Sequence, residues 1–375
     1  MARHHMSEDL VRWYANRSVL ITGHTGFKGA WLASWLQRSG STVTGYSLSP
    51  PSTPNLYAEA NVQRGIRSVH ADICDRSALN NAVSQAQPEV IFHLAAQSLV
   101  RKSYQDPVET FATNVVGTAY VLDAVRRTPA VRAVVVVTSD KCYEHRVDTH
   151  PEDRPFREGD VLGGSDPYSS SKACAELLTH AMRASFFSTG GPRIATARAG
   201  NVIGGGDWAD DRLMPDLMRA AVTGQITPLR HPRSVRPWQH VLEPLRGYLM
   251  LGRALADGPS DAPAVGAWNF GPAETDCIPV RSLCDRVSEQ WPAVRVTEVD
   301  DRSEMREASY LRLDSAKARS SLGWAPVTDV DDAVSMTVAW YRDFYSGRRS
   351  AETLVEAQLD AFEERCTKAG SVERP

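Results

Sequence analysis

Tyr168 and Lys172 stand four residues apart, a spacing that could support proton transfer. On a helix, side chains at positions i and i+4 lie on one face, about one turn apart. A cation beside a phenol favours the phenolate, so we expect the pKa of Tyr168 to fall from about 10 toward neutral pH. The phenol could then act as a base at a hydroxyl group. An isolated Tyr/Lys pair is usually a surface contact. The surrounding elements therefore determine whether this pair is interpreted as catalytic.

Three more polar side chains, Ser139, Asp140 and Lys141, follow directly after the apolar run Ala133 to Thr138. Consecutive valines in this run are typical of a strand that is buried on both faces. Strand C-termini in open parallel sheets point into the ligand crevice, so these side chains are placed for chemistry. A helix cap or a tight turn is the alternative interpretation.

A glycine-rich loop near the N-terminus has the setting of a dinucleotide-binding loop. The loop Gly23-His24-Thr25-Gly26-Phe27-Lys28-Gly29 connects a predicted strand, Val19 to Thr22, to a predicted helix, Phe27 to Arg38. Glycines let the backbone approach a pyrophosphate, and unpaired N–H groups at a helix N-terminus favour anions. Asp72 and Ile73 follow a later strand, where they could read the edge of an adenine. A plain tight turn is the alternative.

One residue that usually distinguishes NAD from NADP is missing. An acidic residue that bonds the ribose 2′-hydroxyl of NAD commonly follows such a loop by about 20 residues, at the end of the second strand. Tyr46 and Ser47 occupy that place in this chain. We expect NAD as the cofactor, although the acidic residue that usually bonds its ribose is missing.

The elements that must position these residues alternate between strand-like runs and segments of helical length. Such alternation predicts an α/β fold with a doubly wound parallel sheet. Helical segments include Pro107 to Arg126 and Tyr168 to Phe187. The predicted strands are Val19 to Thr22, Thr42 to Tyr46, Ile66 to His70, Val90 to His93, Ala133 to Thr138 and Arg193 to Ala197.

The regular alternation ends near Gly200. Gly204-Gly205-Gly206 and frequent prolines follow, which predicts a smaller irregular lobe that contributes a wall to the ligand site. We therefore expect an N-terminal extension over 1–17 and a mainly NAD-binding domain over 18–200. A mainly substrate-binding lobe would cover 201–345, and a peripheral helix and tail would cover 346–375.

Composition excludes several classes of function. The 375 residues are 42% hydrophobic and 23% charged, close to the average of soluble globular proteins. The net charge of −3 supplies no overall field for nucleic acid or an anionic membrane, and neither is an expected partner. We also expect no membrane span, because no apolar run approaches 18 residues, and no signal peptide. The six cysteines form no C-x-x-C pair, which predicts reduced thiols in the cytoplasm and no metal site.

Positive charge is nevertheless concentrated in one segment. From Arg212 to Arg236 the chain carries five arginines, and Asp216 is the one acidic residue there. Guanidinium groups bind diphosphate oxygens well, so this segment is a candidate anion site. A solvated basic face is the alternative.

Together these motifs resemble the extended short-chain dehydrogenase/reductase family, which has a Rossmann-type fold, and within it the CDP-glucose 4,6-dehydratases. The resemblance runs from about Ser18 to Tyr345. Its most specific part surrounds Trp238, and the glycine loop is its least specific part. The segments that carry it are Gly23 to Gly29, Ser139 to Tyr143, Asp166 to Lys172, Arg198 to Trp208, Arg236 to Leu245 and Leu322 to Trp324.

The resemblance implies that CDP-glucose is converted into a 4-keto-6-deoxy sugar nucleotide and water by an internal redox cycle, in which NAD is reduced and then re-oxidised. Tyr168 would take the proton of the sugar 4-hydroxyl, Ser139 would bond the 4-oxygen, and Lys172 would bind the nicotinamide ribose. Related dTDP-glucose dehydratases have an Asp-Glu pair where this chain has Asp140 and Lys141. Asp140 is therefore assigned as the acid for the C6 hydroxyl and Lys141 as the base at C5. A lysine base must be neutral when it acts.

The resemblance also suggests how the substrate is held and how the chain assembles. Arg236 matches the phosphate-binding position of the family, and a homodimer or a dimer of dimers is expected. The other expected substrate contacts are Gln97, Asn201, Arg212, Arg233 and Asn269.

Three alternative functions stay open at this stage. A nucleotide-sugar 4-epimerase shares the fold, NAD and the Tyr/Lys pair, but it does not need the Asp140-Lys141 pair. A dehydratase could also act on another nucleotide-sugar, because the residues do not fix the base. A binding scaffold without catalysis is disfavoured by the complete set Ser139, Tyr168 and Lys172.

Overall fold

A parallel sheet forms the centre of the molecule. The structure is a computed structural model that describes residues 6–144, 154–188, 190–258, 264–299 and 311–371. Within these residues the sheet has seven strands in the order β11-β6-β5-β4-β1-β2-β3, and every pair is parallel. The strands are β1 (Ser18–Thr22), β2 (Thr42–Ser47), β3 (Arg67–His70), β4 (Val90–His93), β5 (Ala133–Val137), β6 (Arg193–Ala199) and β11 (Gly266–Phe270).

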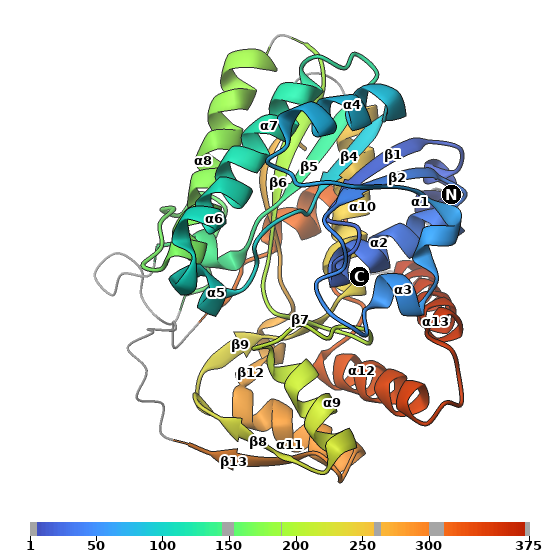
Figure 1. Ribbon diagram of the computed structural model, residues 1–375, viewed down its shortest axis with the longest axis vertical. Coiled ribbons are helices and arrows are strands. Elements are labelled where there is room, and N and C mark those ends of the chain that lie inside the picture. The colour runs from blue at the N-terminus through green and yellow to red at the C-terminus, as the bar shows by residue number, and fades with distance from the viewer. Residues whose placement is uncertain (1–5, 145–153, 189, 259–263, 300–310, 372–375) are drawn as a thin grey trace.

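Helices cover both faces of this sheet (Figure 1). Side chains alternate along a strand, so Val19 and Ile21 join the core on one face while Leu20 joins the core on the other. The first face is covered by α1 (Met6–Tyr14), α2 (Phe27–Arg38) and α10 (Leu242–Asp257). The second face is covered by α4 (Arg76–Ala86), α7 (Gly117–Val125) and α8 (Pro167–Phe186). The predicted doubly wound fold is therefore confirmed.

The helix predicted over 107–126 is helical throughout 107–125, with a π-helical segment in its middle. The structure has α6 (Pro107–Phe111), one π-helical segment over 112–116 and then α7. Gly117 begins α7, and a Cβ there would lie 2.8 Å from Ile73 Cγ2, so the helix packs closely against Ile73 at this point. The short helices α3 (Leu56–Glu59) and α5 (Val100–Gln105) complete this part of the chain.

The smaller lobe lies below the sheet in Figure 1. Its elements are β7 (Val202–Ile203), α9 (Leu213–Thr223), β8 (Ile226–Leu229), β9 (Val235–Pro237), β10 (Gln239–His240), β12 (Cys277–Pro279), α11 (Val280–Gln290), β13 (Arg295–Glu298) and α12 (Val330–Tyr345). Between them the chain returns to the sheet through α10 and β11, so residues 201–345 do not form one continuous lobe. The apolar faces of these two elements, such as the buried Leu245 and Phe270, draw them back to the main core.

The C-terminal helix α13 (Ala351–Ser371) is part of the core rather than peripheral. Its Leu359 and Phe362 are fully buried, and the Phe362 ring packs edge-on against Trp35 of α2. Arg38 at the end of α2 contacts Glu356 at 2.8 Å. A narrow apolar stripe on an otherwise polar helix explains why the sequence suggested a peripheral tail.

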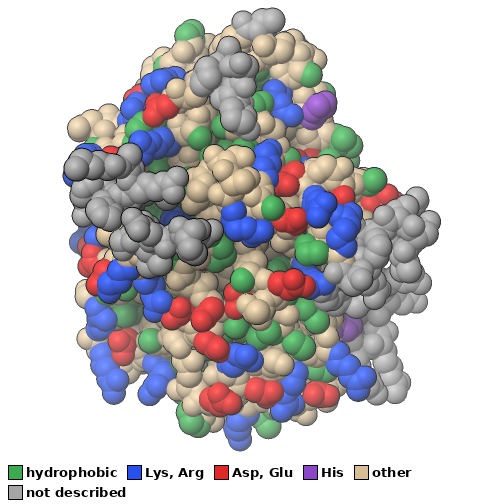
Figure 2. Space-filling model, turned by 180° about the vertical axis from the view of Figure 1, so that it is seen from behind, with side chains coloured by type: hydrophobic (Ala, Val, Ile, Leu, Met, Phe, Trp, Pro, Cys, Tyr) green, Lys and Arg blue, Asp and Glu red, His purple; other side chains and the backbone are tan. Residues whose placement is uncertain are grey.

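The surface has mixed charge on the face opposite to that of Figure 1. Figure 2 shows Lys and Arg side chains interspersed with Asp and Glu side chains there. In the parts of the chain that the structure describes, no helix is long and apolar enough to cross a membrane.

Candidate active site

A cavity of about 810 Å³ lies at the C-terminal ends of the central strands and is walled on the far side by the lobe. Ligands of open α/β sheets bind at this edge, where the strand order reverses, here between β1 and β4. Most residues that the sequence singled out line it. They are Gly23, Thr25, Gly26, Phe27, Lys28, Gly29, Asp72, Ile73, Ser139, Asp140, Lys141, Tyr168, Lys172, Asn201, Arg212 and Arg236.

The glycine loop fits a dinucleotide. Gly23 has φ +78°, and a Cβ there would lie 2.7 Å from the Ala95 nitrogen. A Cβ on Gly29 would lie 2.1 Å from the Gly23 oxygen, so only glycine allows this tight turn. Gly26 is the N-cap of α2 and lines the cavity, which leaves the first N–H groups of the helix available to an anion.

The end of β2 lacks the usual acid, as the sequence indicated. Ser47 bonds Thr25 of the glycine loop at 2.8 Å instead. The Tyr46 hydroxyl donates to the Asp72 carbonyl oxygen at 2.6 Å and fixes the segment that would face the adenine. Ile73 is 4% exposed beside this segment.

Ser139, Asp140 and Lys141 form a tight turn directly after β5. The Ser139 hydroxyl donates to Asp140 Oδ1 at 3.0 Å and accepts the Lys141 N–H at 3.2 Å. Asp140 is 2% exposed, and its Oδ2 has no hydrogen-bond partner among the described residues. Burial raises the pKa of Asp140, although the charges of Lys141, Arg236 and Lys28 and the Ser139 hydrogen bond oppose this rise. A raised pKa favours the protonated form of this carboxyl, which suits it to act as an acid.

Tyr168 and Lys172 lie one turn apart on α8, as predicted, and both line the cavity. The expected fall in the pKa of Tyr168 is not found. Burial raises this pKa to about 12, and a hydrogen bond with Ser139 and the charge of Arg212 offset only part of the rise. Burial lowers the pKa of Lys172 to about 8, because the site disfavours charge on either group.

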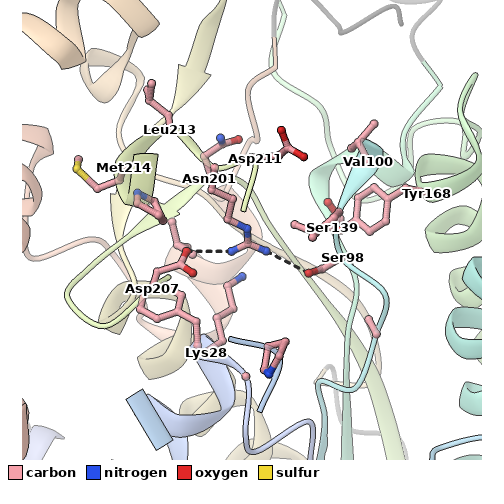
Figure 3. Close-up of a pocket in the computed structure, with 18 of the residues that line it drawn as sticks. Lys28, Ser98, Val100, Ser139, Tyr168, Asn201, Asp207, Asp211, Leu213 and Met214 are labelled. Carbon is pink, nitrogen blue, oxygen red and sulfur yellow. Dashed lines mark hydrogen bonds and ion pairs between the residues drawn. The ribbon is translucent and has the colours of Figure 1, made fainter. Parts of the chain in front are cut away.

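Lys28 is a third lysine, after Lys141 and Lys172, in the lining of the cavity. Burial and the nearby charges of Arg212 and Lys172 lower its pKa to about 8, whereas Asp140 acts in the opposite direction. Figure 3 shows Lys28 reaching from the glycine loop below the lobe residues Asn201 and Asp207. The cavity is therefore cationic between the cofactor loop and the catalytic turn.

Arg212 bridges the lobe and the sheet across the cavity. Its guanidinium contacts Asp207 Oδ2 at 3.2 Å on the lobe and donates to the Ser98 hydroxyl at 3.1 Å beyond β4. A second bridge joins Arg101 to Asp211 at 3.7 Å. Sequence reasoning missed Ser98, Arg101 and Asp207, because folding alone brings them to one place.

Gln97 and Asn269 were expected to contact substrate, but the structure places them outside the cavity lining. The Gln97 amide donates to the Leu99 oxygen and to Thr110, each at 3.0 Å, and so holds its own loop. The Asn269 amide nitrogen donates to the Phe156 carbonyl oxygen at 2.9 Å behind the catalytic turn. The side-chain amides of Gln97 and Asn269 therefore form hydrogen bonds within the protein.

His24 and Arg233 also have side chains outside the cavity lining. The His24 ring is fully buried over Gly45 and bonds the Ser68 hydroxyl at 2.6 Å. Burial, followed by the charge of His70, lowers the pKa of His24 to about 4, so its imidazole is neutral near pH 7. Only the backbone of His24 stays in the cofactor loop, and Arg233 is exposed on the surface.

The fold and the cavity define the class of protein to which this chain belongs. The model of the NAD dependent epimerase/dehydratase family matches residues 19–267. The chain belongs to this family, which confirms NAD as its cofactor class.

Curated relatives narrow the comparison. The chain is 42% identical over 340 residues to the CDP-glucose 4,6-dehydratase of Salmonella typhimurium, covering 89% of this chain and 93% of the relative. It is 27% identical to the dTDP-glucose 4,6-dehydratase of Neisseria gonorrhoeae, covering 89% of this chain and 98% of that one. The resemblance predicted from the motifs is therefore confirmed.

Solved structures share the fold at lower identity. The UDP-glucose 4-epimerase of Thermotoga maritima, solved with UDP-glucose, has a TM-score of 0.75 and 20% identity. The match covers 87% of this chain and 99% of the epimerase. At this identity the likeness concerns the fold alone.

Proposed function

We propose that this chain is a CDP-glucose 4,6-dehydratase, a lyase that forms CDP-4-dehydro-6-deoxy-D-glucose and water. The observation that carries the proposal is the Asp140-Lys141 pair, which lines the same cavity as Ser139, Tyr168 and Lys172. The similarity of the chain to the Salmonella CDP-glucose enzyme supports the choice of substrate.

Oxidation at C4 of the glucose ring comes first. Tyr168 takes the proton of the 4-hydroxyl, and the Ser139 hydroxyl bonds the oxygen that becomes a ketone. When bound, NAD would supply a hydride acceptor for C4 and, in its reduced form, a hydride donor for C6. Positive charge near the Tyr168 hydroxyl is needed for this group to lose its own proton, because burial raises its pKa to about 12. Arg212 is the cation whose charge lowers the pKa of Tyr168.

Elimination follows because the C4 ketone acidifies the C5–H bond. Lys141 takes the C5 proton, and Asp140 donates a proton to the C6 hydroxyl as the C6–O bond breaks. One water molecule leaves, and a C5–C6 double bond conjugated with the ketone remains. Return of the hydride to C6 and of a proton from Lys141 to C5 would then give the 4-keto-6-deoxy product. The raised pKa of Asp140 supports the role of acid.

The diphosphate of the substrate is assigned to arginines on the lobe side of the cavity. Arg236 is 5% exposed and lies near enough to Asp140 to influence its pKa. Arg212 and Arg230 also line the cavity. Guanidinium groups in a partly buried site bind diphosphate oxygens with charge-assisted hydrogen bonds.

A nucleotide-sugar 4-epimerase is the second candidate, because solved epimerases share this fold. The mass of the product separates the two functions. A dehydratase removes one water molecule from the sugar, whereas an epimerase leaves the mass unchanged. Incubation with CDP-, dTDP-, UDP- and GDP-glucose, followed by mass spectrometry, tests the reaction and the base together. Dehydration of another nucleotide-sugar in preference to CDP-glucose would overturn the choice of substrate.

We also infer a homodimer in the cytoplasm. Exposed apolar side chains gather on α5, α6, the turn that follows α6, and α8, which lie side by side in Figure 1. They are Tyr104, Val108, Phe111, Val116 and Leu177. An exposed apolar patch of this kind is typical of an interface. Light scattering tests this inference, and the mass of a single chain at micromolar concentration would contradict it.

A further inference from the structure

Glu176 and Arg198 form a buried ion pair that takes no direct part in the cavity. Arg198 Nε lies 2.9 Å from Glu176 Oε1, and Nη2 lies 2.7 Å from Oε2. The two side chains are 3% and 2% exposed, and neither residue lines the cavity. Burial would raise the pKa of Glu176, but the hydrogen bonds and charge of Arg198 outweigh it and lower this pKa. Both groups are therefore charged behind the catalytic turn.

This ion pair holds both ends of the turn that carries Ser139, Asp140 and Lys141. Before the turn, the Thr138 hydroxyl donates to Glu176 Oε1 at 2.5 Å. After the turn, Arg198 Nη1 donates to the Tyr143 hydroxyl at 2.7 Å. Thr138 before the turn and Tyr143 after it are thus both hydrogen-bonded to the Glu176–Arg198 ion pair.

The same ion pair also fixes the turn relative to α8. Glu176 lies on α8, one turn after Lys172 and two turns after Tyr168. The proposed acid and C5 base lie after β5, whereas the residues proposed for C4 oxidation include Tyr168 on α8. Catalytic groups on separate elements must keep their relative placement within about 0.5 Å. Charge-assisted hydrogen bonds are short and strong, and a bidentate pair adds geometric specificity.

We propose that Glu176 and Arg198 are positioning residues that keep the catalytic turn in register with Tyr168 and Lys172. This proposal rests on the proposed dehydratase function. The competing possibility is that the ion pair only stabilises the fold.

The chain offers a matched pair of variants that separates these possibilities. Thr138 and Thr196 both donate their hydroxyl to Glu176, at 2.5 Å and 2.7 Å. Both are buried, at 6% and 2% exposed, but Thr138 precedes the turn and lines the cavity, whereas Thr196 lies on β6 outside the turn and outside the cavity lining. Thr138→Val and Thr196→Val each remove one hydrogen bond to the same carboxylate and keep the side-chain shape. Neither change leaves a buried charge without its partner.

The experiment measures kcat, KM and the thermal midpoint of both variants on CDP-glucose. We expect the two variants to lower the thermal midpoint of unfolding by similar amounts and to leave KM nearly unchanged. Only Thr138→Val should lower kcat, by about tenfold to about a hundredfold, since a small misplacement of reacting groups has an effect of this size. Equal effects on kcat, or no effect of Thr138→Val, would overturn the proposal.

Tyr143→Phe provides a second variant at the end of the turn nearer to Lys141, and Tyr143, unlike Thr138, lies outside the cavity lining. It removes the hydroxyl that Arg198 contacts. We expect it to slow formation of the product more than reduction of bound NAD, so reduced cofactor accumulates. A parallel loss of both steps would instead indicate general loosening and contradict the assignment.

Backbone hydrogen exchange of the whole protein supplies a readout that needs no substrate. Thr138→Val should speed exchange at residues 139–142 relative to Thr196→Val, whereas equal exchange would contradict the proposal. If wild-type protein fails to dehydrate any of the four nucleotide-sugars, the proposed function fails. The exchange comparison still decides whether the ion pair positions the turn.

Discussion

Gly200 lies directly against the carboxyl group of Asp140. A Cβ at position 200 would lie 2.8 Å from Asp140 Oδ2 and 2.6 Å from Pro237 Cγ, too close for either contact. Gly200 follows β6, so the end of that strand sets the space available to the proposed acid. The type of residue at position 200 therefore controls the placement of the Asp140 carboxyl in the turn after the neighbouring strand β5.

Gly200→Ala should displace the Asp140 carboxyl and slow elimination more than oxidation. Loss of a well-placed general acid commonly lowers the rate by about 10² to 10⁴. Product formation and NAD absorbance measured together test this expectation. Gly159→Ala is the control, because a Cβ at Gly159 meets nothing within 4 Å. Normal turnover by Gly200→Ala would contradict the role of Asp140.

Tyr168→Phe should abolish reduction of NAD on mixing with CDP-glucose. The phenol oxygen is the group assigned to accept the 4-hydroxyl proton, and loss of a general base commonly lowers the rate by about 10² to 10⁴. Stopped-flow absorbance of the nicotinamide measures this step alone. A near-normal rate of NAD reduction would remove Tyr168 from the oxidation.

Arg236→Ala should weaken binding of CDP-glucose far more than binding of NAD. A charge-assisted hydrogen bond contributes roughly 1.5 to 3 kcal/mol, or about tenfold to 150-fold in affinity. Calorimetric titration with each ligand gives the comparison. The exposed Arg233 supplies a control through Arg233→Ala, which should change neither affinity. Equal weakening of both ligands by Arg236→Ala would mean that Arg236 is structural.

Affinity for NAD should fall as pH rises through about 8. Lys172 has a pKa of about 8 in the folded protein, because burial disfavours its charge. Raising the pH above this value removes the charge proposed to hold the nicotinamide ribose. Titrations from about pH 6.5 to about pH 9.5 test this direction. The dependence should be weaker in Lys172→Met, and a flat wild-type profile would contradict the role of Lys172.

The sequence was most informative where one element determines the position of a residue. The strand β4 and the helix α2 have the predicted bounds, because apolar runs and the glycine loop specify them locally. The spacing of Tyr168 and Lys172 likewise required only a helix. The predicted pKa of Tyr168 was wrong in direction, since the sequence shows the neighbouring cation but not the degree of burial.

Contacts between distant segments could not be predicted in the same way. Ser98 and Arg212 are 114 residues apart and meet only because the lobe folds across the cavity. Asn269 lies in the chain segment assigned to the lobe, but its strand β11 returns to the sheet behind the catalytic turn. Polar residue type therefore did not distinguish support of the site from contact with a ligand.

The most direct test of the proposed dehydratase is the behaviour of Lys141→Ala on mixing with CDP-glucose. Lys141 lines the cavity beside Asp140 and is the group assigned to take the C5 proton. Lys368→Ala, on the exposed side of α13, is the control and should behave as wild type.

Stopped-flow absorbance of the nicotinamide, beside quantitation of the 4-keto-6-deoxy product, separates oxidation from elimination. Lys141→Ala should reduce bound NAD at a near-normal rate and then stall, so that reduced cofactor accumulates while product falls by about 10² or more. Normal turnover, or a loss of NAD reduction as deep as the loss of product, would contradict the assignment of Lys141 as the base.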